Sequence, residues 1–169
     1  SVGSKTSHGS ESTGVIPFMK VVDAEMLAFS QGVTRRGSYA AYIDISHPEI
    51  EEFLDVRKPT GGDINRKSIN LHHAIVIPDV FMKLIDRATQ EDGFDDSWDL
   101  IDPHSGEVKK TVSAKTLWVK LIQNRIETGA PYIMFGDAVN ESLPEFQKKL
   151  GLKVNQSNLC SEITLPTNE

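Results

Sequence analysis

The chain has 169 residues, which suits one domain with a single core of ordinary size. Hydrophobic residues make up 38% and charged residues 25%, as in soluble globular proteins, and the net charge of −6 argues against a general nucleic-acid binder. No apolar run approaches the roughly 20 residues that span a bilayer, and the single cysteine, Cys160, excludes an internal disulfide and favours a reducing, cytoplasmic setting.

The two ends of the chain are unusual for an independent domain. Residues 1–14 form a polar, Gly/Ser-rich stretch without a secretory signal, and the chain stops soon after an apolar strand pattern. We therefore expect an interior piece of a longer protein.

Helix and strand patterns alternate along the first half of the chain. Three-to-four-residue apolar spacing, in which Phe18 and Val21 take part, predicts a helix over 15–32, and a strand follows over 38–45. A helix over 46–58 has Ser46 as its expected N-cap. A Pro/Gly loop, a β-branched strand over 69–78 and a helix over 79–90 capped by Asp79 come next.

The second half continues this alternation. Residues 98–112 predict a surface hairpin that turns at 104–106, and 113–129 predict a helix capped by Ser113 that buries Leu117, Leu121, Ile122 and Ile126. A short, nearly all-apolar strand over 131–140, a helix over 143–151 and a final strand over 159–165 complete the pattern. Strands separated by helices predict an α/β fold with a mostly parallel sheet; the pattern alone leaves open whether the sheet closes into a barrel.

The final predicted strand carries the most distinctive chemistry. On a strand, side chains alternate between faces, so Asn158, Cys160 and Glu162 are expected to share one face. Because the neighbouring carboxylate disfavours a thiolate, Cys160 is expected to stay protonated and to suit hydrogen-atom transfer better than attack on a carbonyl. Two alternatives are an edge strand with an inert thiol and an ordinary cysteine hydrolase whose partners meet only in space.

Two loops hold further polar residues: residues 3–13, with Lys5 and His8, and the stretch that contains Arg35 and Arg36. The stretch 30–39 places Arg35, Arg36 and Gly37 between a helix end and a strand, where forked donors suit phosphates and base edges. The histidines do not have metal-ligand spacing: His72 and His73 are adjacent on a predicted strand and should face opposite ways. We expect no metal site.

"SNLCSEI" resembles the active-site strand of the ribonucleotide reductase large (catalytic) subunit, of the class I type found in bacteria and their viruses. "GVIPFMK", "QGVTRRGSYAAYIDISHPEIEEFLD", "RKSINLHHAIVIPD" and "TGAPYIMFGDAVN" resemble successive stretches of the same protein. The resemblance covers essentially the whole chain. It implies that residues 1–169 are part of a single catalytic barrel domain, an interior portion of the family's ten-stranded α/β barrel.

The resemblance implies a role for each residue of the trio. Cys160 would form a transient thiyl radical that takes the hydrogen from ribose C3′, Glu162 would accept the 3′-hydroxyl proton, and Asn158 would hydrogen-bond the ribose. The expected substrate contacts are Asn158, Leu159, Cys160, Ser161, Glu162 and Arg36. The expected effector and specificity residues are Ser4, Lys5, His8, Gln31, Arg35, Arg36 and Gly37.

The same resemblance implies the partners. They are ribonucleoside di- or triphosphates, dNTP or ATP effectors, the remaining segments of the large subunit, and a small radical-generating subunit. This chain would bind no cofactor itself. A diiron-tyrosyl small subunit is the first expectation for the radical source and adenosylcobalamin the second, with a dithiol as reductant. Since Cys160 is the chain's only cysteine, the isolated chain is expected to have no turnover. The alternative is a non-catalytic binding module derived from the barrel. If the protein is viral, the expected location is the host cytoplasm.

Overall fold

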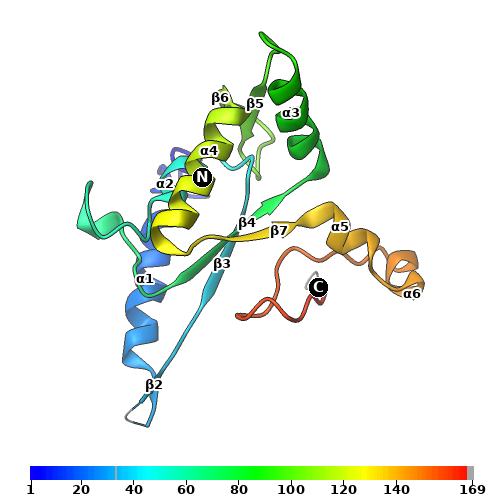
Figure 1. The fold of residues 1–169 in the computed structure, drawn as a ribbon. Helices are drawn as coiled ribbons and strands as arrows, with labels where there is room; N and C mark the ends of the chain where they lie inside the picture. The colour runs from blue at the N-terminus through cyan, green and yellow to red at the C-terminus, as the bar shows by residue number, and fades with distance from the viewer. Residues whose placement is uncertain (33, 167–169) are drawn as a thin grey trace.

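The computed structural model describes residues 1–32 and 34–166, with the side chains of Ser30 and Gln31 left undescribed (Figure 1). The helices are α1 (Val15–Ala28), α2 (Ile50–Leu54), α3 (Asp79–Gln90), α4 (Ala114–Thr128), α5 (Gly136–Glu141), α6 (Glu145–Lys149) and the 3-10 turn η1 (Ile64–Arg66). The strands are β1 (Ser30–Gln31), β2 (Arg35–Arg36), β3 (Ala40–Asp44), β4 (His72–Ile77), β5 (Ser97–Ile101), β6 (Val108–Ser113) and β7 (Tyr132–Phe135).

A parallel sheet in the order β3-β4-β7 organises the fold. Ile43 pairs with Ile75, and Ile75 with Ile133, so one residue of each strand stands in a row across the sheet. Crossover helices connect these strands, as parallel pairing requires. The confirmed predictions are the three strands, α1, α3 and α4, and the β5–β6 surface hairpin with its turn after Ile101. The described residues do not form a closed barrel.

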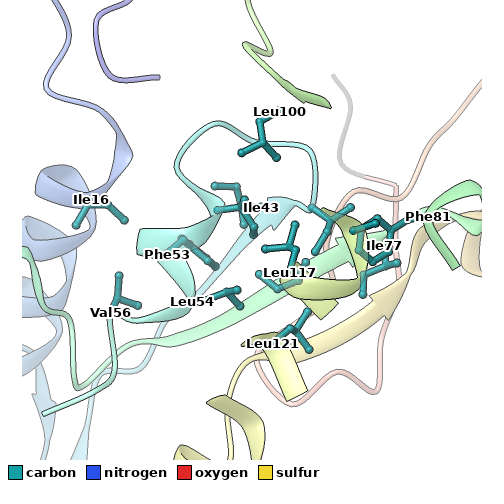
Figure 2. Packing of buried hydrophobic residues seen from close by; sticks show 14 of the residues in the cluster. Ile16, Ile43, Phe53, Leu54, Val56, Ile77, Phe81, Leu100, Leu117 and Leu121 are labelled. Carbon is teal, nitrogen blue, oxygen red and sulfur yellow. The ribbon is translucent and has the colours of Figure 1, made fainter. Parts of the chain in front are cut away.

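One side of the sheet, which we call the core face, packs against helices. Its side chains are Ala41, Ile43, His73, Ile75, Ile77 and Ile133. Figure 2 shows Phe53 and Leu54 of α2 and Leu117 and Leu121 of α4 directed toward Ile43 and Ile77. Ser113 caps α4 by accepting a hydrogen bond from the Thr116 amide at 3.1 Å, as expected. These contacts bury most of the chain's apolar core on one side.

The other side of the sheet, which we call the loop face, carries Tyr42, Val76, Tyr132 and Met134. These residues alternate with those of the core face because successive side chains on a strand point to opposite sides. In Figure 1 the orange-to-red C-terminal segment lies on this side of β7, opposite α4. The loop face therefore receives an irregular segment where the core face receives helices.

The predicted strand over 159–165 is wrong, because this segment is irregular and turns at Leu159–Ser161. Ser161 has a positive φ of 64°, which a strand does not allow. Asn158 uses its backbone and side chain to pair with Ile163 across the turn. Asparagine side chains that bond nearby backbone compete with strand pairing in this way. Strand-like composition at Ile163–Leu165 was therefore misleading.

Several predicted helix details also fail. The expected N-cap Ser46 lies in a turn whose amide donates to Asp44, and α2 begins only after Glu49. Asp79 is the first residue of α3 rather than its cap, and its amide donates to Asp137 at 2.7 Å. Ile126, expected to be buried, is 80% exposed, because nine helical residues rotate it about 180° from Leu117.

Helix α1 has an unexpected exposed side. Phe18 and Val21, which contribute to its apolar spacing, are 67% and 65% exposed, whereas Ile16, Met19 and Asp23 are buried. Asp23 is buried because its carboxylate accepts hydrogen bonds from the backbone amides of Asn70 and Leu71. Within the described residues, no helix is long and apolar enough to cross a membrane.

Candidate functional site

Residues 158–163, here called the thiol loop, form a closed turn with Cys160 near its tip. The Asn158 amide donates to the Ile163 carbonyl at 3.0 Å, and the Ile163 amide donates to Asn158 Oδ1 at 3.0 Å. The Asn158 carbonyl also accepts a hydrogen bond from the Ser161 amide at 3.1 Å. These three bonds fix the shape of the loop without a neighbouring strand.

The thiol loop presents its reactive groups differently from the predicted strand. Cys160 is a free, exposed thiol, and Glu162 is also exposed. Asn158 is half-buried and uses its amide oxygen within the loop. The prediction that the three side chains share one strand face is therefore wrong, although the turn keeps all three within one compact segment. Their contacts with substrate stay predictions, as do those of Leu159 and Ser161.

The thiol loop is tied to the loop face of the sheet. The hydroxyls of Tyr42 on β3 and Ser157 are hydrogen-bonded to each other. A pocket of about 500 Å³ is lined by β7, by Tyr42 and by Ser157, Ser161 and Thr164. A second pocket of about 600 Å³ shares Tyr42 and extends along the carboxyl ends of the strands to Asp137 and Asn140. Ligands of parallel α/β sheets bind at this end of the strands.

The predicted specificity residues Arg35 and Arg36 lie on β2 of a short antiparallel hairpin with β1. Both side chains are exposed. Gly37 lies tightly against α1: its amide donates to the Phe29 carbonyl at 2.7 Å, and an added Cβ would meet the Met26 carbonyl at 3.1 Å. Gln31 belongs to β1, but its side chain lies outside the described part of the chain. Figure 1 shows this hairpin beyond the C-terminal end of α1, apart from the orange-to-red C-terminal segment.

The other predicted effector loop, residues 3–13, lies in the N-terminal stretch 1–14, which two buried carboxylates hold. Glu49 accepts hydrogen bonds from the Val2 amide at 3.1 Å and the Val15 amide at 2.9 Å, which closes the loop at both ends. Gly14 allows this contact, since its φ is 89° and an added Cβ would lie 2.1 Å from Glu49 Oε1. Lys5 and His8 stay exposed on the loop.

Asp102 in the β5–β6 turn provides the second carboxylate. It accepts hydrogen bonds from the Ser1 hydroxyl, from the Ser4 hydroxyl at 2.5 Å, and from the amides of Ser105 and His104. These donors stabilise the charged form and lower the pKa of Asp102. The two predicted effector segments lie at opposite ends of α1, which is about 21 Å long for 14 residues, so the chain does not bring them together.

The adjacent histidines of β4 face opposite ways, as predicted. His73 packs edge-on against Phe53 on the core face, with ring centroids 5.2 Å apart, and burial lowers its pKa to about 3. His72 stacks on Tyr132 on the loop face, with ring centroids 5.8 Å apart, and burial lowers its pKa as well. Among the described residues, no three His, Cys, Asp or Glu side chains are grouped to hold a metal ion.

Comparison with known proteins identifies the family. The family model for the ribonucleotide reductase barrel domain matches residues 1–169. The chain belongs to this family. A putative ribonucleoside-diphosphate reductase large subunit of Frog virus 3 (isolate Goorha) is 50% identical over 157 residues, covering 93% of this chain and 26% of that protein. The large subunit of Invertebrate iridescent virus 3 is 43% identical, covering 94% of this chain and 32% of that protein.

A solved structure supports the fold of this ribonucleotide reductase segment. The class Id ribonucleotide reductase alpha subunit of Actinobacillus ureae matches with a TM-score of 0.67 and 29% identity, covering 93% of this chain and 24% of that one. The chain thus spans about a quarter to a third of the length of these relatives. The family membership predicted from the sequence is confirmed, in viral and bacterial relatives alike, and it does not favour a cysteine hydrolase.

Sequence reasoning missed two residues that support the site. Tyr42 interrupts the apolar strand between Ala41 and Ile43. Because side chains on a strand alternate between faces, its position could have placed it on the face opposite to these two residues. The sequence indicated no site role for Glu49, although its side chain accepts a hydrogen bond from the amide of Val2, 47 residues earlier. Such a long-range contact has no local sequence signal.

Proposed function

We propose that this segment provides the radical-bearing thiol of a ribonucleotide reductase large subunit, within a single catalytic barrel domain that reduces ribonucleoside di- or triphosphates. The observation that carries the proposal is the exposed Cys160 at the tip of the thiol loop, next to Glu162 and beside a 500 Å³ pocket on the loop face. The family match supports it.

In the proposed reaction, the Cys160 thiyl radical forms an S–H bond as the ribose C3′–H bond breaks, which leaves the unpaired electron on C3′. Glu162 takes the 3′-hydroxyl proton and later returns it, and the 2′-hydroxyl leaves as water with one of the two protons of a dithiol reductant. The other dithiol proton goes with two electrons to C2′, the dithiol becomes a disulfide, and Cys160 returns its hydrogen to C3′, which regenerates the thiyl radical. A small radical-generating subunit supplies the radical, with a diiron-tyrosyl centre as first choice and adenosylcobalamin as second. A dithiol supplies the two electrons of the net reduction. Deoxynucleotides or ATP acting at the loops of residues 4–8 and 31–37 would regulate the choice of base.

Replacing Cys160 by Ser in the full-length subunit tests this function. Serine keeps the size and polarity of the side chain, but its O–H bond is too strong to carry the hydrogen transfer. Deoxynucleotide formation should fall below detection while substrate nucleotide still binds. Product formation at the wild-type rate by the Cys160→Ser variant would refute the role of Cys160. It would favour the alternative of a non-catalytic module.

A matched pair of carboxylate variants tests the role of Glu162. Glu162→Gln removes the proton acceptor beside Cys160 and should lower kcat by about 100-fold, within the range of general-base catalysis. Glu141→Gln changes an exposed carboxylate on α5 in the same way and should leave kcat within twofold. Equal effects of the two substitutions would contradict a specific role for Glu162.

A further inference from the structure

We infer that Tyr42 is a positioning residue for the thiol loop, acting through Ser157; this inference rests on the proposed function. The starting observation is the hydrogen bond between the hydroxyls of Tyr42 and Ser157, which lie 115 residues apart in the chain. Tyr42 belongs to a strand of the sheet, and Ser157 directly precedes the thiol loop.

The direction of this hydrogen bond follows from the neighbouring one. Ser157 Oγ donates to the Asn158 carbonyl at 2.8 Å. Since a serine hydroxyl has a single proton, Ser157 must accept from Tyr42, so Tyr42 is the donor. The Asn158 carbonyl also accepts from the Ser161 amide at 3.1 Å. A chain of donors therefore runs from the sheet, through Ser157, to the turn that holds Cys160.

Tyr42 has the rigid surroundings that a positioning residue needs. Its strand pairs in register with β4, so that Tyr42 lies opposite Ala74 and Ile43 lies opposite Ile75. Ala74 and Ile75 have no exposed surface, and Ile43 is 9% exposed on the core face. The Tyr42 ring itself is half-buried and lines both pockets of the loop face. The hydroxyl is thus fixed by the best-packed part of the fold.

The thiol loop needs such an anchor because, among the described residues, its remaining hydrogen bonds are internal. The pairing of Asn158 with Ile163 and Ser161 fixes the shape of the loop but not its position over the sheet. Upstream, Asn140 holds the backbone of Val154 with bonds of 2.8 and 3.0 Å, but Ser157 comes three residues later. Hydrogen transfer requires the reacting atoms to lie within about 3.5 Å, so a small displacement of Cys160 should reduce the rate strongly.

The test compares Tyr42→Phe with Tyr39→Phe in the full-length subunit, assayed with its radical-generating partner, a dithiol and substrate deuterated at C3′. Tyr42→Phe keeps the ring and removes the donor, so kcat should fall about tenfold with KM within twofold, and the 3′-deuterium isotope effect on kcat should rise. Tyr39→Phe removes the same atom from an exposed tyrosine just before β3 and should leave both values unchanged. Ser157→Ala should match Tyr42→Phe, and the double variant should be no slower than either single one.

Cys160→Ser in the same assay separates the two proposals. If that variant is inactive while Tyr42→Phe keeps a wild-type kcat and isotope effect, the positioning role is refuted and the proposed function stands. A lower kcat with an unchanged isotope effect would also refute it, because the loss would then not lie in hydrogen transfer. If Cys160→Ser still forms product, the proposed function itself fails.

Discussion

The two faces of the β3-β4-β7 sheet are built from the same strands but differ in what covers them. The core face packs aliphatic side chains against α2 and α4, and Ile75 and Ile77 have no exposed surface. The loop face carries two tyrosines and a half-buried valine beneath an irregular segment with a free thiol. Burial on one side fixes the strands, and polar groups with room for a ligand gather on the other.

His72 and His73 show this difference within one dipeptide. His73 lies on the core face, packs against Phe53 and is only 1% exposed. His72 is half-buried and stacked on Tyr132. We therefore expect substitutions on the core face to act on stability and those on the loop face to act on chemistry.

The largest expected difference between the faces is in core packing. Ile75→Ala leaves a cavity under α2 and α4 and should lower the free energy of unfolding by about 3 to 5 kcal/mol. Val76→Ala removes a half-buried side chain from the loop face and should cost about 1 kcal/mol. Urea unfolding of both variants measures the contrast. Equal losses would show that the faces are equally packed.

His73 should make the core face sensitive to acid. Because burial lowers its folded-state pKa to about 3 from about 6.5, the unfolded chain binds the proton more readily between these values. The stabilisation from this residue is complete above about pH 6.5 and is lost as the pH falls toward 3, by roughly 3 kcal/mol between pH 7 and pH 4. His73→Leu should flatten that part of the stability profile. An unchanged slope in this variant would assign the acid sensitivity to other groups.

The N-terminal loop and the thiol loop differ in the groups that hold them. A buried carboxylate holds the N-terminal loop, whereas neutral hydroxyls hold the thiol loop. Glu49→Gln replaces one acceptor oxygen with a donor facing the Val2 or Val15 amide and should destabilise the chain by about 1 to 3 kcal/mol. Glu51→Gln alters a 43% exposed carboxylate paired with Lys110 and should cost less than about 1 kcal/mol. Thermal unfolding of the two variants measures both losses. A loss for Glu49→Gln no larger than that for Glu51→Gln would contradict the closing of the loop by Glu49.

The smallest expected effect on stability is at the thiol loop. Asn158→Ala removes the acceptor of the Ile163 amide at an exposed turn, so the free energy of unfolding should change by less than about 1 kcal/mol. Hydrogen exchange of the Ile163 amide should nevertheless become about five- to tenfold faster. Unchanged exchange would mean that Asn158 does not hold the loop closed.

The strands and the main helices were predictable from the sequence because their apolar residues recur every two and every 3.6 positions. These are the residues that each element buries on the core face. The prediction failed where side chains accept hydrogen bonds from nearby backbone amides, as Asp44 does before α2 and Asn158 does in the thiol loop. The segment 163–165 has strand-like composition, but composition does not report whether a pairing strand is available. The candidate residues of the thiol loop came from the motif, whereas Tyr42, Ser157 and Glu49 act through contacts distant in sequence.

Protection of Cys160 by nucleotide is the most direct test that the exposed thiol above the loop face meets the substrate. Peptide-level alkylation of Cys160 by iodoacetamide at neutral pH would be followed in the full-length subunit, with and without saturating substrate ribonucleotide. We predict slow alkylation without nucleotide and a further decrease of about tenfold with it. Identical rates in the two conditions would contradict a nucleotide site at the thiol loop.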